Sequence, residues 1–315
     1  MVKIVSGMNV ITDIHQISKE TNSVVTIGTF DGVHTGHRKI LETVAERSRV
    51  LGARSVLITF NPHPRMVITA GHPVPMLTTM DEKIAILKEF GLDILYFIPF
   101  TWEFAALTAE QFIREYLIDR IGVREVIVGY DHRFGKGRDG DEKKLRELGS
   151  SYGFGTDIIP AVSIDGTLVN STAIRKQIEK GAVETASKML GRFYSFTGIV
   201  HSGSQRGRQL GFPTANITVE CREKLLPANG VYAIRAEING EALTGVMNIG
   251  YRPTFNDVQE RVIEVHLFGF EKDIYNATIT VATVARIRAE KRFNSKEELI
   301  AQIQQDVETA KAILK

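Results

Sequence analysis

The sequence has 315 residues, of which 43% are hydrophobic and 24% charged, and it carries a net charge of +2. This length suits two domains that each bury a core, and the small charge excludes a protein built to bind nucleic acid or an acidic membrane. No apolar run reaches the roughly 18 residues of a membrane span, and the start makes a poor signal peptide. With one cysteine, Cys221, no disulfide forms within the chain, so we expect a cytoplasmic protein.

Strand-like and helix-like segments alternate from residue 24 to about residue 181. The expected strands are continuous apolar runs, typical of strands buried on both faces of a parallel sheet, at residues 24–27, 55–60, 93–100 and 125–130. Thr108 with Gln111 forms a capping box, and helices are expected at residues 38–51, 81–90 and 109–121. The first half therefore predicts a Rossmann-like α/β domain with a parallel sheet.

A glycine-spaced loop, GTFDGVHTGH at residues 28–37, joins the first of these strands to the first helix. The first backbone N–H groups of a helix lack partners within it, and the helix dipole favours anions at that end. Gly28 lets a ligand approach the backbone, and His34 and His37 lie one turn apart where a triphosphate would bind. Two alternatives stay open: the histidines are surface or capping residues, or they bind zinc with His63, although no HExxH motif or nearby cysteine supports zinc.

The same string resembles the GxFDxxHxGH signature of the HxGH nucleotidyltransferases. The resemblance implies transfer of a nucleotidyl group, with His34 and His37 as catalytic residues. It also implies that the rest of the loop binds the nucleotide, through Gly28, Thr29, Phe30 and Asp31.

The string NPHP at residues 61–64 directly follows the second expected strand. Its two prolines restrict the backbone, which places Asn61 and His63 at the carboxyl edge of the sheet, where α/β proteins bind ligands. We therefore expect a phosphate contact from His63, and a turn histidine is the alternative.

VNSTAIR at residues 169–175 resembles the ISSTxxR element of these transferases. Ser171 and Thr172 are expected to cap a helix whose Arg175 faces the same way as Ser171. The resemblance implies that the two hydroxyls and the guanidinium contact the β- and γ-phosphates.

GKGRDG at residues 135–140 matches the GxGxxG pattern of dinucleotide-binding folds, so NAD or FAD as a bound cofactor is an alternative. The match lies late in the sheet, whereas the first strand–helix turn already carries a better phosphate motif. The longer string at residues 128–140 resembles instead the VGxDFxFGxxxxG segment of bacterial FAD synthetases. That resemblance implies that Asp131 and Phe134 line the nucleotide and flavin pocket, while His132 departs from the family's phenylalanine.

From about residue 185 the hydrophobic pattern changes to strict alternation. Residues 231–238 alternate, and Asn239-Gly240 predicts a hairpin turn into residues 241–249. Further strands are expected at residues 262–268 and 277–290, and Ser295 with Glu298 caps a final helix. This half predicts a small antiparallel β-barrel closed by a C-terminal helix.

Residues 198–217 join a glycine-rich loop to the string PTAN and resemble the riboflavin kinase signature. No Walker A sequence is present, so a different loop must hold phosphates. The Thr214 hydroxyl and the Asn216 amide oxygen are hard metal ligands suited to Mg²⁺, although a bare PTAN is more typical of a turn. The resemblance implies nucleotide contacts from the whole group, Gly203, Gly207, Arg208, Gly211, Pro213, Thr214 and Asn216.

In the expected strand at residues 262–268, alternation places Glu264 and His266 on the face opposite the apolar residues. A solvent-exposed glutamate on a one-sided sheet is the alternative. In riboflavin kinases the corresponding ExH glutamate is the base that takes the proton from the ribityl 5′-hydroxyl, so the resemblance implies this catalytic role for Glu264. Gly269 and Asn276 depart from the family's pattern.

Nearly the whole chain thus resembles the bacterial bifunctional riboflavin kinase and FAD synthetase family. The resemblance implies that residues 186–315 phosphorylate riboflavin to FMN with ATP, and that residues 1–185 adenylylate FMN to FAD with release of pyrophosphate. ATP, riboflavin and FMN are then substrates, Mg²⁺ is the cofactor, and the expected partners are small molecules. Two alternatives stay open: a nucleotidyltransferase for a different acceptor, and a flavin- or nucleotide-binding regulatory protein with one inactive site.

Overall fold

The computed structural model describes residues 3–5, 7–69, 74–201, 212–252, 260–270, 272 and 274–315. The chain forms two compact units. The first holds Met1–Val74 and Met80–Asn170, and the second holds Pro75–Thr79 and Ser171–Lys315. The main division between the compact units lies between Asn170 and Ser171, before residue 185. The boundary between the two functional domains stays a prediction.

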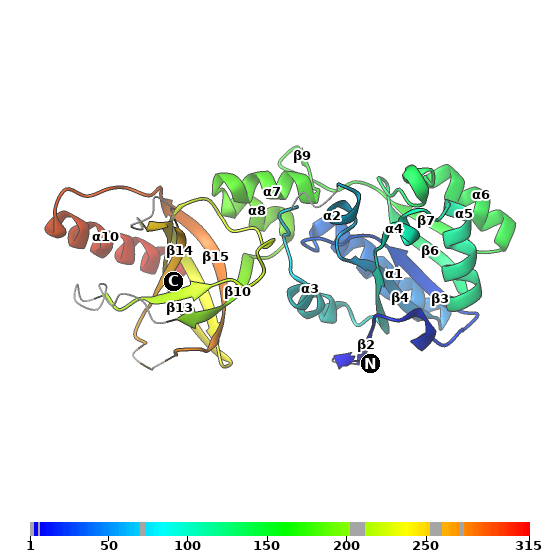
Figure 1. Ribbon diagram of the computed structural model, residues 1–315, viewed down its shortest axis with the longest axis horizontal. Coiled ribbons are helices and arrows are strands. Elements are labelled where there is room, and N and C mark those ends of the chain that lie inside the picture. Colours follow the sequence, from blue (N-terminus) through cyan, green and yellow to red (C-terminus); the bar gives the residue numbers. More distant parts are fainter. Residues whose placement is uncertain are drawn as a thin grey trace. The chain divides into compact units, whose positions relative to one another are not determined.

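The first unit is built on a seven-stranded sheet with the order β1-β2-β5-β4-β3-β6-β7 (Figure 1). All neighbouring strands from β2 to β7 are parallel, and β1 alone pairs antiparallel, with β2. The strands are β1 (Lys3–Val5), β2 (Met8–Ile11), β3 (Ser23–Ile27), β4 (Arg54–Asn61), β5 (Ile94–Pro99), β6 (Val123–Gly129) and β7 (Gly155–Ile159). The predicted parallel α/β sheet is confirmed.

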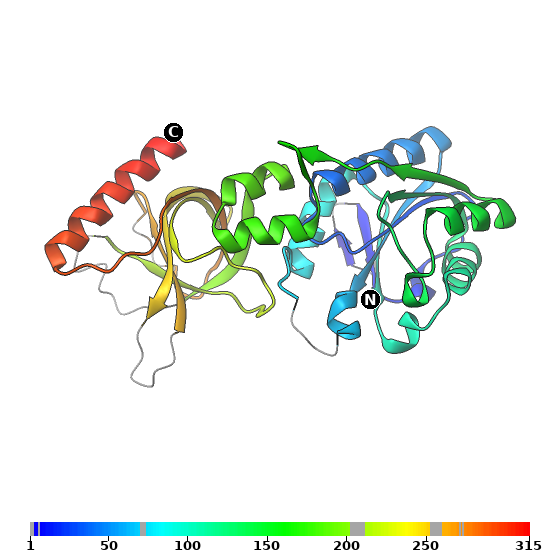
Figure 2. The same ribbon diagram turned by 90° about the horizontal axis from the view of Figure 1, so that it is seen from above.

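Helices cover both faces of this sheet, which explains why all five residues of β3 are buried (Figure 2). On one face, α1 (Thr35–Leu51) and α3 (Met80–Leu87) pack against the strands through Leu41 and Leu87. On the other face pack α5, η3 and α6, with the bounds Ala109–Phe112, Ile113–Ile121 and Glu142–Tyr152. The capping box of Thr108 and Gln111 is confirmed, but the single helix expected at residues 109–121 continues from Ile113 as a π-helix.

Short helical turns lie between the main elements of this unit. They are η1 (Ile14–Gln16), α2 (Pro64–Ile68), η2 (Lys88–Phe90), α4 (Trp102–Ala105) and η4 (Lys136–Arg138). After β7, a small hairpin of β8 (Ser163–Ile164) and β9 (Thr167–Leu168) ends the unit.

The chain reverses its direction across the sheet at β3. From β3 it runs outward to β4 and β5, then crosses back so that β6 pairs with the other side of β3. At such a switch point the loops that leave neighbouring strands turn to opposite faces and open a crevice at the carboxyl edge of the sheet. The loops that follow β3 and β6, residues 28–34 and 130–135, leave the sheet at this switch point, so the topology predicts a ligand site there.

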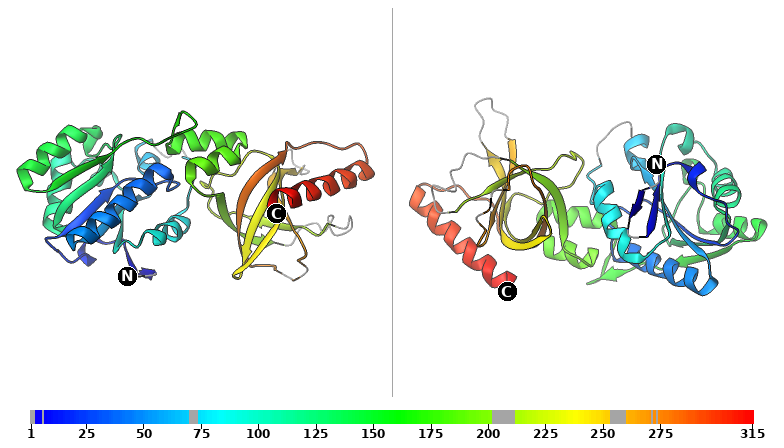
Figure 3. Two further views of the ribbon diagram at one scale, coloured as in Figure 1. Left: turned by 180° about the vertical axis from the view of Figure 1, so that it is seen from behind. Right: turned by 90° about the horizontal axis from the view of Figure 1, so that it is seen from below.

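The second unit contains a closed antiparallel barrel with the strand order β10-β11-β14-β13-β12-β15 (Figure 3). Its strands are β10 (Tyr194–His201), β11 (Ala215–Thr218), β12 (Gly230–Ile238), β13 (Glu241–Arg252), β14 (Glu260–Leu267) and β15 (Thr278–Arg288). Asn239 and Gly240 both have positive φ, 52° and 80°, as a type I′ hairpin turn requires. The predicted barrel and hairpin are confirmed.

Helices pack against the outside of the barrel. Helix α8 (Val183–Leu190) packs against β10 and β15, and α7 (Ser171–Lys180) packs against α8. The final helix, α10 (Lys296–Leu314), begins after Ser295, whose side chain accepts a hydrogen bond from the Glu298 N–H, as predicted. Asp306 on α10 is 3% exposed and accepts hydrogen bonds of 2.8–3.0 Å from Arg288, which fastens the helix to β15.

Two helix-ending glycines of the first unit differ only in their surroundings and make a matched pair. Gly122 after η3 and Gly153 after α6 both have left-handed backbones, with φ of 77° and 79°. A Cβ at Gly122 would lie 2.0 Å from the carbonyl oxygen of Glu20, whereas a Cβ at Gly153 meets no atom within 4 Å.

We expect Gly153→Ala to lower the free energy of unfolding by about 1–2 kcal/mol, the usual cost of a left-handed alanine. Gly122→Ala should cost at least about twice as much, because the backbone of Glu20 must also move. Urea unfolding followed by circular dichroism measures both losses. Equal losses would contradict the close approach of Glu20 to Gly122.

Candidate active sites

The loop between β3 and α1 has an unusual backbone. Phe30 and Val33 adopt positive φ of 46° and 39°, which non-glycine residues rarely do, and Gly32 between them has φ of 82°. Asp31 is fully buried, as are Phe30 and Val33. Such a conformation persists only where surrounding contacts hold it, and it is typical of ligand-binding loops.

His34 and His37 form a stacked pair at the start of α1. Their ring centroids lie 3.6 Å apart with an interplanar angle of 18°, and the Phe30 ring lies 4.9 Å from that of His37. His34 is the N-cap of α1, because its Nδ1 accepts a hydrogen bond of 3.3 Å from the His37 N–H. A Cβ at Gly36 would come within 3.2 Å of this nitrogen, so glycine leaves room for the cap.

The cap fixes the tautomer of His34. An Nδ1 atom that accepts a hydrogen bond carries no proton, so the neutral imidazole carries its proton on Nε2. The capping alternative is therefore correct for His34. An N–H group at Nε2 is a hydrogen-bond donor of the kind that a phosphate oxygen accepts.

Lys83 on α3 is a residue that the sequence analysis missed. Its side chain is 3% exposed, and its Nζ donates a hydrogen bond of 2.7 Å to the carbonyl oxygen of Thr29. Burial lowers the pKa of Lys83 to about 8, although the negative charge of Asp31 acts in the opposite direction. Lys83 lies four residues before Leu87 and therefore on the same face of α3, and this spacing could have indicated that the lysine is buried.

The predicted residues after β4 lie at the same carboxyl edge of the sheet. His63 is the N-cap of α2, and its Nδ1 accepts a hydrogen bond of 3.1 Å from the Arg65 N–H. Asn61 ends β4, which pairs in parallel with β3, so both loops leave the sheet at one edge. As with His34, the histidine caps a helix through Nδ1.

The loop after β6 holds the remaining predicted residues of the first unit. Asp131 is exposed and Phe134 is buried, with the His132 ring 5.5 Å from the Phe134 ring and nearly parallel to it. Burial, reinforced by the positive charges of Arg133 and Arg138, lowers the pKa of His132 to about 4. The ring is therefore neutral at pH 7.

The string GKGRDG forms a closed turn. Phe134 and Gly140 exchange two backbone hydrogen bonds of 2.9 and 3.1 Å, and a Cβ at Gly140 would lie 2.7 Å from the Phe134 ring. Gly135 and Gly137 supply positive φ within the turn. The glycines thus serve the turn and its packing, and the dinucleotide alternative has no structural support.

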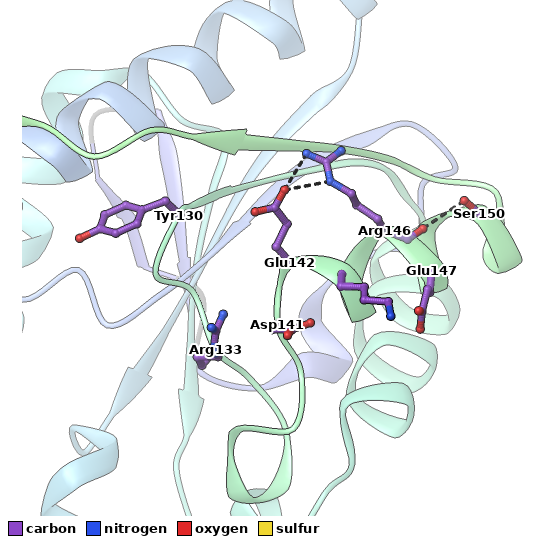
Figure 4. A pocket seen from close by; sticks show the side chains of 8 residues that line it. Tyr130, Arg133, Asp141, Glu142, Arg146, Glu147 and Ser150 are labelled. Carbon is purple, nitrogen blue, oxygen red and sulfur yellow. Dashed lines mark hydrogen bonds and ion pairs between the residues drawn. The ribbon is translucent and has the colours of Figure 1, made fainter.

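A shallow, open depression of about 650 Å³ lies between the loop after β6 and α6 (Figure 4). Tyr130 and Arg133 line it from the loop, and Glu142 and Arg146 line it from α6, where they form an ion pair of 3.1 Å. None of the predicted site residues lines it. Its lining mixes acidic and basic groups, so its charge favours no single ligand class.

Ser171, Thr172 and Arg175 lie in the second unit, at the start of α7. Helix α7 begins at Ser171, so the two hydroxyl residues lie in the first turn of the helix that they are expected to cap, and the capping itself stays a prediction. The Nε of Arg175 donates a hydrogen bond of 2.6 Å to the carbonyl oxygen of Pro75. That these residues join the histidines around one nucleotide stays a prediction.

The barrel aligns the predicted kinase residues across neighbouring strands. Glu264 on β14 lies directly opposite Asn216 on β11 and Asn248 on β13. Ile263 and Val265 are buried in the barrel, whereas Glu264 is half-buried on the outer face, so the expected alternation is confirmed. The sequence analysis did not single out Asn248, because only the strand register brings it opposite Glu264.

His266, two residues after Glu264 on the same strand, makes a hydrogen bond to the PTAN string. The Nδ1 of His266 lies 2.8 Å from the carbonyl oxygen of Pro213, which can only accept, so Nδ1 carries the proton. Thr214 follows Pro213 and is exposed at the entrance to β11. Four other predicted residues, Gly203, Gly207, Arg208 and Gly211, lie outside the described residues.

Among the described residues, no three His, Cys, Asp or Glu side chains are arranged to hold a metal ion. The zinc alternative at His34, His37 and His63 therefore lacks structural support. Thr214 and Asn216 supply hydroxyl and amide oxygens, which belong to a different class of metal ligand.

Comparison with known proteins decides between the remaining alternatives. Residues 16–173 match the family model for FAD synthetase, and residues 190–314 match the model for riboflavin kinase. A bifunctional riboflavin kinase/FMN adenylyltransferase from Bacillus subtilis is 36% identical over 305 residues, which are 95% of this chain and 96% of that protein. The chain belongs to the bifunctional riboflavin kinase/FMN adenylyltransferase family.

Other relatives of this bifunctional family span the chain in the same way. The protein of the same name from Escherichia coli K12 is 38% identical, over 96% of this chain and 97% of its own length. A crystal structure from Streptococcus pneumoniae, described as a macrolide-efflux protein, matches with a TM-score of 0.88 and 31% identity over 96% of this chain and 98% of that one. No helix within the described ranges is long and apolar enough to cross a membrane.

Membership of this bifunctional family establishes two activities for the chain. It phosphorylates riboflavin to FMN with ATP, and it adenylylates FMN to FAD. These findings favour the two flavin activities over a different acceptor or a regulatory protein.

The lowered pKa of Lys83 predicts how stability depends on pH. The ammonium loses its proton near pH 8 in the folded chain and near 10.5 in the unfolded chain. Between these values the unfolded state binds more protons, so the contribution of Lys83 to the free energy of unfolding rises with pH.

We expect the free energy of unfolding of the native chain, minus that of Lys83→Met, to rise by about 2 kcal/mol between pH 8 and pH 10. Urea unfolding of both proteins across this range measures the difference. Because other titrating groups are common to both chains, they cancel. A flat difference would show that the ammonium is not buried as described.

Proposed function

We propose that residues 1–185 carry the adenylyl transfer and residues 186–315 the riboflavin kinase reaction, each in its own site. The observation that supports the first assignment is the stacked pair of His34 and His37 at the start of α1. The second assignment is supported by Glu264, which faces Asn216 across the barrel strands. We place the enzyme in the cytoplasm, with small molecules as its partners, on the basis of its single cysteine and its substrates.

In the adenylyl transfer, an oxygen of the FMN phosphate attacks the α-phosphorus of ATP, and the bond to the β-phosphate breaks to release pyrophosphate. The phosphate is already ionised at pH 7, so this step needs no general base. Catalysis then consists of positioning and charge neutralisation. His34, His37, His63 and Arg175 donate to the phosphates, and the nucleotide and flavin are bound by Gly28, Thr29, Phe30, Asp31, Asn61, Asp131, Phe134, Ser171 and Thr172.

In the kinase reaction, the ribityl 5′-hydroxyl of riboflavin attacks the γ-phosphorus of ATP, and ADP leaves. A neutral hydroxyl benefits from a base, and Glu264 takes its proton. Gly203, Gly207, Arg208, Gly211 and Pro213 form the phosphate-binding loop.

Thr214 and Asn216 would hold Mg²⁺ in this site. They are two residues apart where the chain enters β11, a spacing that favours the same side of an extended segment, and Asn216 pairs with Glu264. Mg²⁺ bound there would neutralise phosphate charge. Incubation with riboflavin, ATP and Mg²⁺, followed by chromatographic separation of riboflavin, FMN and FAD, tests both reactions together.

We expect Glu264→Gln to lower FMN formation by about a hundredfold or more, because the base is lost. Conversion of added FMN to FAD should stay within about twofold of the native rate, since adenylyl transfer uses other residues. Glu237→Gln, which changes an exposed carboxylate on β12 of the same barrel, is the matched control. A parallel loss of both activities in a folded protein would overturn the separation of the sites.

We expect His37→Ala to lower the rate of FMN adenylylation at least about tenfold, as loss of a phosphate contact worth about 1.4 kcal/mol in the transition state would do. The kinase rate, measured on the same preparation, should not change. His15→Ala, an exposed histidine of η1, serves as the control. An unchanged FAD yield would remove His37 from the mechanism.

A further inference from the structure

The carbonyl group of Thr29, at the start of the loop that leads to the histidines, is held in place by two side chains. The oxygen of Thr29 accepts two hydrogen bonds, 2.7 Å from Lys83 Nζ on α3 and 3.0 Å from Thr59 Oγ1 on β4. Both donors are buried, with side chains 3% and 0% exposed. The carbonyl is thus held from two elements that are far from it in sequence.

The backbone after this carbonyl needs such support. Phe30 and Val33 both have positive φ, a conformation that is strained for a non-glycine residue. Thr29 is joined directly to Phe30, so the two hydrogen bonds act on the residue where the strained turn begins. Without them, the turn is free to relax towards an ordinary conformation.

The strained turn influences the positions of the two histidine rings through ring contacts. The Phe30 ring lies 4.9 Å from the His37 ring, which in turn stacks on His34 at 3.6 Å. A shift of Phe30 therefore changes the support of His37 and, through it, the stacked geometry. Catalysis by positioning is sensitive to displacements of about 1 Å.

A buried ammonium at this place is costly for the fold. Desolvation of a charged group destabilises the folded state, and a residue needed only for packing would be better replaced by methionine or leucine. The one polar contact described for Lys83 is made to the carbonyl of the catalytic loop. The loss of stability from burying the ammonium is therefore best explained by the contact that Lys83 makes with this loop.

We propose that Lys83 is a positioning residue for adenylyl transfer, which holds the Thr29 carbonyl so that Phe30 presents His37 and His34 to the phosphates of ATP. The proposal rests on the role proposed for His37. Lys83 acts through the loop and touches no reacting atom.

A double-mutant cycle on the rate of FMN adenylylation tests the proposal. We expect Lys83→Met to lower kcat about tenfold in the native background but less than about twofold in the His37→Ala background, because it acts through His37. KM for ATP should change less than kcat. Lys88→Met, an exposed lysine shortly after α3, is the matched control and should leave both parameters unchanged.

The outcomes separate the two proposals. If His37→Ala leaves the rate unchanged, the role of His37 and that of Lys83 both fall. If His37→Ala lowers the rate but Lys83→Met does not, or lowers it equally in both backgrounds, the role of Lys83 alone falls.

A second variant covers the case in which Lys83→Met does not fold. Thr59→Val removes the other donor to the same carbonyl without changing charge or shape much. We expect about a threefold loss in kcat that likewise disappears in the His37→Ala background. An additive loss, or none, would contradict the proposed role of the Thr29 carbonyl.

Discussion

Parallel pairing of β3 with both β4 and β6 is the constraint on which the adenylyl transfer site depends. Because all three strands run in one direction, the loops that follow them leave the sheet at one edge. The chain changes direction across the sheet at β3, and α/β proteins bind ligands at such a switch point. The histidine pair, the NPHP string and the loop with Asp131 all lie along this edge, although more than 90 residues separate His34 from Asp131 in the chain.

Two roles were weighed for the histidines of this edge, helix capping and phosphate binding, and the structure shows the first of them for His34 and His63. His34 and His63 each cap a helix through Nδ1, which satisfies an N–H group that the helix itself leaves without a partner. The same hydrogen bond orients the ring and places the proton of the neutral imidazole on Nε2. Capping is therefore compatible with the proposed phosphate contacts, because the two roles use different ring nitrogens. Lys83, on helix α3, donates a hydrogen bond to the carbonyl oxygen of Thr29 in the loop that leads to His34.

In the barrel, the antiparallel register of the strands brings the candidate kinase residues together, as the switch point does for the loops of the sheet. Asn216, Glu264 and Asn248 come from three strands, and pairing places them side by side on the outer face. Closure of the barrel buries the alternate residues, so a polar row is available on that face without cost to the core. His266 holds the PTAN string against this row through the Pro213 carbonyl.

The two fold classes, the hairpin at Asn239-Gly240 and the two sets of motifs could be predicted from the amino-acid sequence, because they depend on local periodicity and on short strings. The strands that were not expected are β1, β2, β7, β8, β9, β10 and β11. Most of them are only two to five residues long, too short for a clear period, whereas β10 alternates buried and half-buried residues and was overlooked. The burial of Lys83 against Thr29 and the pairing of Asn248 with Glu264 became visible only in the folded chain. Such contacts join segments that are distant in the chain, and local sequence carries no record of which strands pair.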